Sequence, residues 1–487
     1  MGVSSERVAE VLNSVPKGLL IGGEWIDTAS KVLVENPATG TTLAEVADAS
    51  PEQGIQALDA AVAAGPAWAA TDPRERGEIL RRAFELLHER ADEFALLMTL
   101  EMGKPLGESR GEVAYGAEFF RWFSEEAVRI SGRYSVAPSG GTRLLTMKQP
   151  VGPVYAITPW NFPLAMGTRK IGPALAAGCT VVVKPAKQTP LTTLALAQLL
   201  IDAGVPAGVV NVITTNRSGA VSSPIIADPR LRKLTFTGST EVGRMLIGEA
   251  AERVLKVSME LGGNAPFVVF GDADLDRAVD GAMLAKMRNI GEACTAANRF
   301  IVHESVAEEF GRKLAARMAA LTIGAGIDDG VEVGPLVDAV AVAKVSELVA
   351  DAIDAGAQVL TGNTPIDGPG HFYTPTVLQN VPTTARMFTE EIFGPVAPIT
   401  TFVTDDEAIA LANATEFGLV SYAFTKDLTR AITVAERLES GMVGINQGIV
   451  SNPAAPFGGI KSSGLGREGG PEGIEEYLET KYVGLAL

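Results

Sequence analysis

The sequence predicts an α/β protein with two doubly wound, open parallel sheets and a protruding hairpin. From about residue 150, short β-branched runs alternate with helical segments at intervals of roughly 25–30 residues, as in a parallel sheet covered by helices. The same alternation starts again after Asn264. Between 130 and 149, a glycine-rich turn separates two extended runs.

The segment 50–130 is predicted to be helical and to precede the first sheet. Asp72 followed by Pro73 is a helix-start signal, because proline fits the first helical position. Apolar residues then recur on one face at helical spacing: Ile79, Leu80, Ala83, Phe84, Leu86 and Leu87.

The two α/β regions are predicted strand by strand. In the first, the expected strands are VYAI (154–157), TVVV (180–183), VVNVI (209–213), KLTF (233–236) and VLKVSM (254–259). The expected helices between them span 164–177, 191–203 and 240–252. The second region begins with the strand APFVVF, a helix from Asp274, the strand RFIV and a long helix near 304–320.

This pattern divides the chain into three predicted parts. Residues 1–129 and 150–260 form a first domain, and residues 261–460 form a second. Residues 130–149 and 476–487 form the third part, because the tail EYLETKYVGLAL ends in a strand-like run that could pair with the hairpin. A protruding hairpin exposes strand edges that need covering, most simply by another subunit.

Composition excludes several function classes. The formal net charge of −17 argues against a nucleic-acid partner, since phosphate binding relies on Lys and Arg. The histidines, His88, His303 and His371, are far apart, so neither a metal site nor a cysteine–histidine protease is expected. No apolar run reaches the roughly 18 residues of a membrane helix. The N-terminus lacks a signal pattern, and two cysteines suit a reducing compartment, so we expect a cytoplasmic protein.

Two glycine-containing stretches were weighed as phosphate-binding loops. GLGREG (464–469) fits a dinucleotide fingerprint, but no strand precedes it and too few residues follow for the rest of a βαβ unit. KLTFTGSTEVGRM (233–245) is the better candidate, because a strand runs into Gly238 and Ser239 and a helix then begins. An ordinary capped turn would give the same pattern.

Polar residues follow other strands of the first sheet in the same way. Lys184 follows VVV, and Trp160 and Asn161 follow VYAITP. In an open α/β sheet, ligands bind in the crevice outside the carboxyl ends of the strands. These segments therefore predict one polar crevice.

The two cysteines have different surroundings. Cys179 lies in ALAAGCTVVV, between a helix end and a buried strand, and is predicted to be structural. Cys294 lies in the polar stretch MRNIGEACTAANRF, where backbone amides could lower its pKa. The surrounding residues leave nucleophile and bystander equally open for Cys294.

Glu260 and Asn161 are candidates for acid–base and oxyanion roles. Glu260 ends an apolar strand, and burial would raise its pKa toward the range of a general base. Asn161 stands in PWNFP, where two prolines stiffen the chain and could present a rigid amide to an oxyanion. The alternative for Glu260 is a structural carboxylate at a strand end with its hydrogen bonds made. The alternative for Asn161 is an ordinary turn asparagine.

Together the motifs resemble the aldehyde dehydrogenase superfamily, in order and over nearly the whole chain. The matching stretches are TPWNFP (158–163), VVVKPA (181–186), FTGSTEVG (236–243), MELGGNAP (259–266), RNIGEAC, EEIFGPV (390–396) and PFGGIKSSGLGRE (456–468). The succinate-semialdehyde dehydrogenase branch is the most similar, through GAEFFRWFSEEAVRISG (116–132), TRKIGPALAAGC (168–179) and Arg288.

The resemblance implies a Rossmann-like cofactor-binding domain, a catalytic domain and an oligomerisation segment, for the three predicted parts in that order. It implies that Cys294 attacks an aldehyde, that Asn161 holds the oxyanion, and that Glu260 activates the water that hydrolyses the thioester. Similar proteins form dimers or tetramers through a hairpin like 130–149, so we expect a homodimer or homotetramer.

The resemblance also implies a nicotinamide cofactor. Trp160, Gly238 and Ser239 belong to the implied cofactor site. Lys184 and Ser239 match contacts to its ribose and pyrophosphate, and Glu391 and Phe393 match residues that place the nicotinamide end. Lys187 stands where NAD-preferring relatives usually carry a glutamate, so we expect NADP, with NAD as the alternative.

For the substrate, the resemblance implies succinate semialdehyde. Arg169 and Arg288 match arginines that hold its distal carboxylate, and two guanidiniums can offer forked donors to one carboxylate. Ser451 matches a nearby hydroxyl. Arg169 and Lys170 could instead be a surface pair. Glu292 replaces a glutamine common in the family, and its charge would raise the pKa of Cys294 if it pointed inward.

Other functions are compatible with the same fold. Glutarate semialdehyde or a neutral aldehyde could be the substrate. A coenzyme A-acylating enzyme would generally lack the water-activating glutamate, whereas Glu260 is present. A cofactor-free acyl-transfer hydrolase using Cys294 would cleave esters without a change in nicotinamide absorbance. A non-enzymatic structural or binding protein of the same fold would be expected to lose the Cys-Glu-Asn set, and all three members are present.

Overall fold

The computed structural model describes residues 3–486 and is an α/β protein. Its helices are α1 (Ser5–Ser14), α2 (Pro51–Ala70), α3 (Pro73–Glu89), α4 (Ala91–Met102), α5 (Leu106–Glu126), α6 (Ala165–Ala177), α7 (Pro190–Asp202), α8 (Ser218–Ala227), α9 (Thr240–Ala251), α10 (Leu275–Met287), α11 (Glu304–Ala319), α12 (Ala339–Asp354), α13 (Asp405–Asn413), α14 (Leu428–Arg437) and α15 (Gly470–Glu475).

The strands up to the site are β1 (Leu19–Ile21), β2 (Glu24–Ile26), β3 (Lys31–Asn36), β4 (Thr41–Ala47), β5 (Arg133–Val136), β6 (Thr142–Pro150), β7 (Val154–Ile157), β8 (Val181–Lys184), β9 (Val210–Val212), β10 (Lys233–Thr237) and β11 (Lys256–Glu260). The later strands are β12 (Ala265–Val269), β13 (Ala297–His303), β14 (Gln358–Thr361), β15 (Thr376–Gln379), β16 (Val396–Phe402), β17 (Phe417–Gly418), β18 (Val420–Phe424), β19 (Met442–Ile445), β20 (Ile460–Lys461), β21 (Gly464–Leu465) and β22 (Leu478–Ala486).

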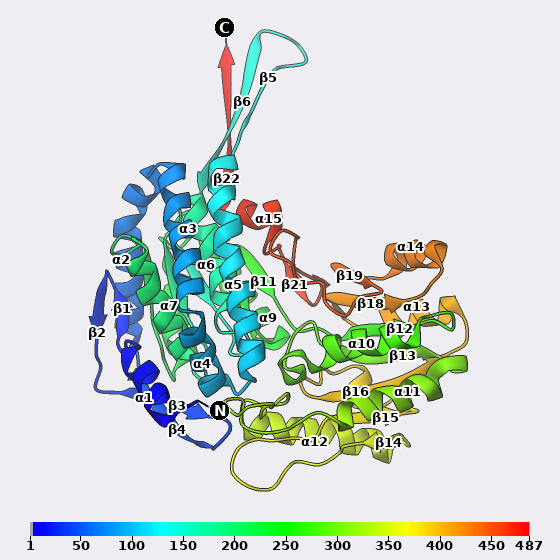
Figure 1. The fold of residues 1–487 in the computed structure, drawn as a ribbon. Helices are drawn as coiled ribbons and strands as arrows, with labels where there is room; N and C mark the ends of the chain where they lie inside the picture. The colour runs from blue at the N-terminus through cyan, green and yellow to red at the C-terminus, as the bar shows by residue number, and fades with distance from the viewer. Residues whose placement is uncertain (1–2, 487) are drawn as a thin grey trace.

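Two open sheets form the body of the molecule (Figure 1). The first has the order β2-β1-β9-β8-β7-β10-β11-β21, and its strands β9 to β11 are parallel. The second has the order β14-β15-β16-β13-β12-β18-β19 and is parallel except for β14. In each sheet the chain winds outward in both directions from a central strand, so the predicted fold class is confirmed.

Alternating side chains explain why each sheet is covered on both faces. In β7, Val154 and Ala156 pack into one apolar core, and Tyr155 and Ile157 pack into another. In β12, Phe267 and Val269 likewise face a different core from Val268. Successive side chains of a strand point to opposite faces of the sheet, so a strand that is apolar throughout needs both faces covered.

The third sheet projects from the body (Figure 1). It has the order β22-β6-β5, and β22 pairs with β6 from Leu478↔Pro150 to Ala486↔Thr142. The expected pairing of the tail with the hairpin is therefore confirmed. The boundaries of the three predicted parts stay a prediction, although β7–β11, β12–β19 and the third sheet fall within them.

The structure contains elements that the sequence analysis did not predict. They include α1, α8, α12–α15 and the strands β1–β4, of which β1 and β2 extend the first sheet as antiparallel strands next to β9. β1 and β2 have three residues each, which carry too little periodicity to be recognised from sequence alone. Among the helices of residues 3–486, none combines the length and the apolar character that a transmembrane span requires.

Candidate active site

The candidate site lies where the predicted crevice was expected, at the carboxyl ends of adjacent strands. β8, β7, β10 and β11 are neighbours in the first sheet, and the chain reverses its winding direction between β7 and β10. Such a reversal leaves a crevice beyond the strand ends. Lys184 ends β8, Glu260 ends β11, and the turns after β7 and β10 carry Asn161 and Ser239.

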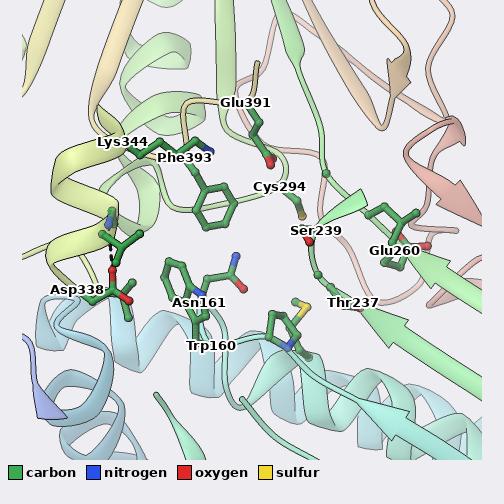
Figure 2. A pocket seen from close by; sticks show the side chains of 18 residues that line it. Trp160, Asn161, Thr237, Ser239, Glu260, Cys294, Asp338, Lys344, Glu391 and Phe393 are labelled. Atoms are coloured by element: carbon green, nitrogen blue, oxygen red, sulfur yellow. Dashed lines mark hydrogen bonds between the residues drawn. The ribbon is translucent and has the colours of Figure 1, made fainter. Parts of the chain in front are cut away.

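A cavity of about 320 Å³ opens at these strand ends (Figure 2). The first sheet lines it with Trp160, Asn161, Met166, Thr237, Gly238, Ser239 and Glu260. The residues after β12 line it with Cys294, Val337, Asp338, Lys344, Glu391 and Phe393. Thr237, Asp338 and Lys344 were not among the sequence candidates. Lys184, Lys187, Arg169, Arg288 and Ser451 lie outside the lining.

Cys294 is held by a tight turn between α10 and β13. Asn289 and Ile290 have φ angles of 55° and 61°, in the left-handed region that non-glycine residues rarely adopt. Gly291 follows with φ 78°, and a Cβ there would lie 2.2 Å from the carbonyl oxygen of Gly394. This strained turn presents a half-buried thiol to the cavity.

The pKa of Cys294 is raised, not lowered as the sequence suggested it could be. Burial raises it to about 12, and Glu391 and Glu260 add to the effect. Arg169 and Arg288 act in the opposite direction but do not outweigh burial. The loss of hydration penalises a thiolate more than nearby positive charge restores it. The free thiol is therefore protonated at neutral pH.

Asn161 is fixed by hydrogen bonds on both its side chain and its backbone. Its Nδ2 donates to the carbonyl oxygen of Glu292 at 3.0 Å, and its Oδ1 accepts from the N–H of Phe162 at 3.1 Å. Its own carbonyl oxygen accepts from Lys104 Nζ at 2.8 Å and from Asn289 Nδ2 at 3.1 Å. An amide has two donor hydrogens. The second one is left for a ligand in the cavity.

A buried ion pair supports the backbone of Asn161. Lys104 and Glu112 pair with each other, and each side chain is only 1% exposed. Glu112 Oε1 also accepts from the N–H groups of Leu164 and Ala165, at 3.0 and 3.1 Å. Sequence analysis missed this pair, because a lysine and a glutamate near a helix ordinarily lie in solvent.

Glu260 is buried with an incomplete set of partners. Its Oε2 has no hydrogen-bond partner in the part of the chain that the structure describes. Burial raises its pKa well above the usual value, and Glu468 adds to this, while Arg169 and Lys170 oppose it. An unpartnered carboxyl with a raised pKa beside a cavity can exchange a proton with a ligand or water there.

Glu468 comes from the GLGREG stretch that was rejected as a dinucleotide fingerprint. Its carboxylate forms ion pairs with both Arg169 and Lys170, and all three side chains are at most 3% exposed. Burial opposes its ionisation, but the two cations hold its pKa below the usual value. Arg169 and Lys170 are therefore not a surface pair.

Glu292 does not act on the thiol. Its Oε1 accepts from the N–H of Val337 at 3.1 Å, so the carboxyl is directed at that backbone. Burial raises its pKa well above the usual value. The raised pKa favours the neutral form of the carboxyl, which resembles a glutamine side chain and adds no charge near Cys294.

The residues suggested for a cofactor occupy both walls of the crevice. Ser239 caps α9 by accepting from the N–H of Val242 at 3.4 Å. Glu391 Oε1 accepts from the N–H of Gly263 at 3.0 Å, and burial raises the pKa of Glu391 to about 7. The rings of Trp160 and Phe393 meet edge to face, with centroids 5.5 Å apart.

Lys184 and Lys187 lie beyond the cavity, at the end of β8. Lys184 is buried and donates to Ser218 Oγ at 3.3 Å, and burial lowers its pKa to about 8. Lys187 is exposed on the turn that follows.

The residues suggested for a substrate carboxylate gather around Tyr115. The guanidinium of Arg288 lies 4.9 Å from the ring centroid of Phe162 and 5.7 Å from that of Tyr115. The guanidinium of Arg169 lies over the ring of Phe457 at 4.2 Å. Ser451 is half-buried, and it lowers the pKa of Tyr115, as both arginines do.

The model of the aldehyde dehydrogenase family matches residues 25–483. The chain belongs to the aldehyde dehydrogenase family. It is therefore an oxidoreductase of a family that uses NAD or NADP to oxidise small aldehydes. Within residues 3–486 of this aldehyde dehydrogenase, no group of three or more His, Cys, Asp and Glu side chains is arranged to hold a metal ion.

Named relatives are similar over nearly their whole length. A succinate-semialdehyde dehydrogenase of Paenarthrobacter nicotinovorans is 61% identical over 91% of this chain and 99% of its own. A glutarate-semialdehyde dehydrogenase of Pseudomonas putida is 52% identical over 96% and 97%. A crystal structure described as an E. coli NADP dependent enzyme has a TM-score of 0.96 and 52% identity, and covers 98% of this chain and 99% of its own.

Proposed function

We propose that this aldehyde dehydrogenase oxidises succinate semialdehyde to succinate with NADP, through a thioester on Cys294. The observation that carries the proposal is the convergence of Cys294, Asn161 and Glu260 on one cavity between the two sheets. No histidine is required, which agrees with a site that has none in its lining.

Acylation starts at the thiol. Cys294 loses its proton and its sulfur forms a bond to the aldehyde carbon, which gives a thiohemiacetal with a negative oxygen. The free Nδ2 hydrogen of Asn161 donates to that oxygen, since the rest of the amide is already fixed. Collapse of the oxyanion expels a hydride and leaves the thioester.

The site has the donor set that a nicotinamide dinucleotide needs. The N-terminus of α9 after Gly238 and Ser239 suits a pyrophosphate, and the Glu391 carboxylate suits ribose hydroxyls. Trp160 and Phe393 offer apolar surface for the nicotinamide ring. When bound, the oxidised nicotinamide would supply the acceptor for the hydride that leaves the oxyanion.

Hydrolysis of the thioester is assigned to Glu260. Its unpartnered carboxyl oxygen takes a proton from a water molecule, and the hydroxide attacks the thioester carbon. The bond to sulfur breaks, succinate leaves, and the thiol of Cys294 is regenerated. Because Glu260 is in place, water rather than coenzyme A is the proposed acyl acceptor.

Arg169, Arg288 and Ser451 are proposed to bind the distal carboxylate. Arg288 carries the available positive charge, since Arg169 already pairs with Glu468. The named succinate-semialdehyde relative supports a four-carbon substrate. The named glutarate-semialdehyde relative supports a second candidate, the same reaction on glutarate semialdehyde.

NADP is proposed over NAD because of Lys187, an exposed cation that could meet the 2′-phosphate. The solved relative described as NADP dependent supports the same choice. We further propose a homodimer or homotetramer in the cytoplasm, on the basis of the projecting sheet and the two free thiols.

The test is an initial-rate assay of reduced nicotinamide formation from succinate semialdehyde, with NADP or NAD. The proteins compared are the wild type, Cys294→Ala and, as a matched control, Cys179→Ala, whose thiol is buried and donates to the carbonyl oxygen of Tyr477 at 3.4 Å. Turnover with NADP that is lost only in Cys294→Ala supports the proposal. Turnover with NAD alone would overturn the inference from Lys187.

A further inference from the structure

The hydroxyl of Tyr115 has no assigned purpose in the proposed mechanism. Tyr115 lies on α5, and its ring packs edge to face on Phe119 with centroids 5.1 Å apart. The ring also contacts the small apolar cluster of Phe162, Met166 and Ala293 next to the thiol. Phenylalanine would fill this place equally well, so the oxygen atom needs its own explanation.

That hydroxyl is buried, and among residues 3–486 it has no acceptor for its hydrogen. A buried hydroxyl that is left unpaired is costly, and it is uncommon in folded proteins. The side chains of Arg169 and Ser451 are hydrogen-bonding neighbours of the phenol oxygen, and a guanidinium can only donate. The hydrogen of the Tyr115 hydroxyl is therefore left without an acceptor close to the candidate nucleophile.

The groups around Tyr115 are donors or cations. Burial raises the pKa of Tyr115, whereas Arg169, Arg288 and Ser451 all act to lower it, which places these three side chains close to the phenol. The nearest strong acceptor of Arg169, Glu468, already pairs with both Arg169 and Lys170. Such a set lacks an anionic acceptor for the phenol, and a carboxylate supplies two acceptor oxygens.

We infer that the Tyr115 hydroxyl donates a hydrogen bond to the distal carboxylate of the substrate and is a specificity-determining residue. This inference rests on the proposed function, because it takes the substrate to be a semialdehyde with a carboxylate at its far end. A neutral aldehyde has no oxygen there for Tyr115 to meet, so Tyr115 discriminates between the two classes.

The test compares wild type and Tyr115→Phe on succinate semialdehyde and on butanal, which has the same carbon chain without the carboxylate. Loss of one hydrogen bond to a charged group should lower kcat/KM for succinate semialdehyde about tenfold, or about 1.4 kcal/mol, mainly through KM. Turnover of butanal should be unchanged, which also shows that the variant is folded.

Tyr373→Phe is the matched control. Tyr373 is another buried tyrosine, but it packs in the apolar core of the second sheet and not in the cluster next to the thiol. Its removal should leave the preference for succinate semialdehyde intact. If wild type prefers succinate semialdehyde and Tyr115→Phe keeps that preference, the inference about Tyr115 fails. If wild type has no such preference, the proposed substrate fails instead.

Discussion

At the residue scale, burial controls the chemistry of the candidate nucleophile and base. Burial raises the pKa of both Cys294 and Glu260, and nearby arginines reduce the effect without reversing it. The thiol of Cys294 is therefore held in its protonated form near neutral pH, and its reactivity depends on removing that proton. A raised pKa makes the Glu260 carboxylate a stronger proton acceptor.

The first prediction is the pH dependence of thiol reactivity. Because the pKa of Cys294 is raised to about 12, its thiolate fraction should grow about tenfold for each pH unit between about pH 7 and pH 9. Alkylation of the free enzyme by iodoacetamide, followed by mass spectrometry, should accelerate accordingly. Cys294→Ala is the control for labelling elsewhere. A rate that is already constant at neutral pH would contradict a raised pKa.

The second prediction separates the two half-reactions. Glu260→Gln should still form the thioester but hydrolyse it at least ~100-fold more slowly, since a positioned base contributes that much or more. Stopped-flow mixing with succinate semialdehyde should show a burst of reduced nicotinamide near one equivalent per site, then a slow phase. Loss of the burst itself would mean that Glu260 acts before the thioester forms.

At the element scale, the link between α4 and α5 supports the turn that presents Asn161 to the cavity. Lys104, in this link, pairs with Glu112 on α5 and donates to the carbonyl oxygen of Asn161. Glu112 accepts from two N–H groups at the start of α6. One buried pair thus joins two helical segments to the turn that follows β7.

The third prediction follows from this link. The double variant Lys104→Met and Glu112→Gln keeps an acceptor for the α6 amides and avoids an unpaired buried charge. Freeing the Asn161 turn should lower kcat about 100-fold, as loss of an oxyanion donor does. Alkylation of Cys294 should be unaffected. Arg110→Met, which breaks the exposed pair with Asp92, should leave kcat unchanged. An unchanged kcat in the double variant would show that Asn161 needs no such support.

At the scale of the whole molecule, the projecting sheet leaves apolar side chains in solvent. Tyr134 on β5 and Tyr482 on β22 are 65% and 61% exposed, and Val136 on β5 is 52% exposed. The expectation of a homodimer or homotetramer assigns these side chains to contacts between subunits.

The fourth prediction concerns assembly. Tyr134→Glu combined with Tyr482→Glu should shift the molar mass measured by light scattering from an oligomer to the monomer of 50.9 kDa. Charges placed in an apolar contact cost far more than they do in solvent. Leu428→Glu, at an exposed position on α14, is the control and should leave the mass unchanged. A wild type that is already monomeric would contradict the expected oligomer.

Much of the fold could be predicted because its signals are local. β-branched runs such as VYAI and APFVVF mark buried strands, and capped helices separate them, so neighbouring residues suffice to find them. The three-residue strands β1 and β2 were missed because they depend on pairing partners rather than on their own periodicity.

The sequence by itself determined the two-sheet α/β fold and a set of candidate side chains at strand ends and in one polar turn. Only the tertiary structure decided which charged residues are buried and what they meet there. Lys170 and Glu468 are 298 positions apart, and Lys104 and Asn161 are 57 apart, so no local pattern could pair them. The same holds for the pKa of Cys294, because hydration and distant charges, rather than adjacent residues, set the free energy of its ionised form.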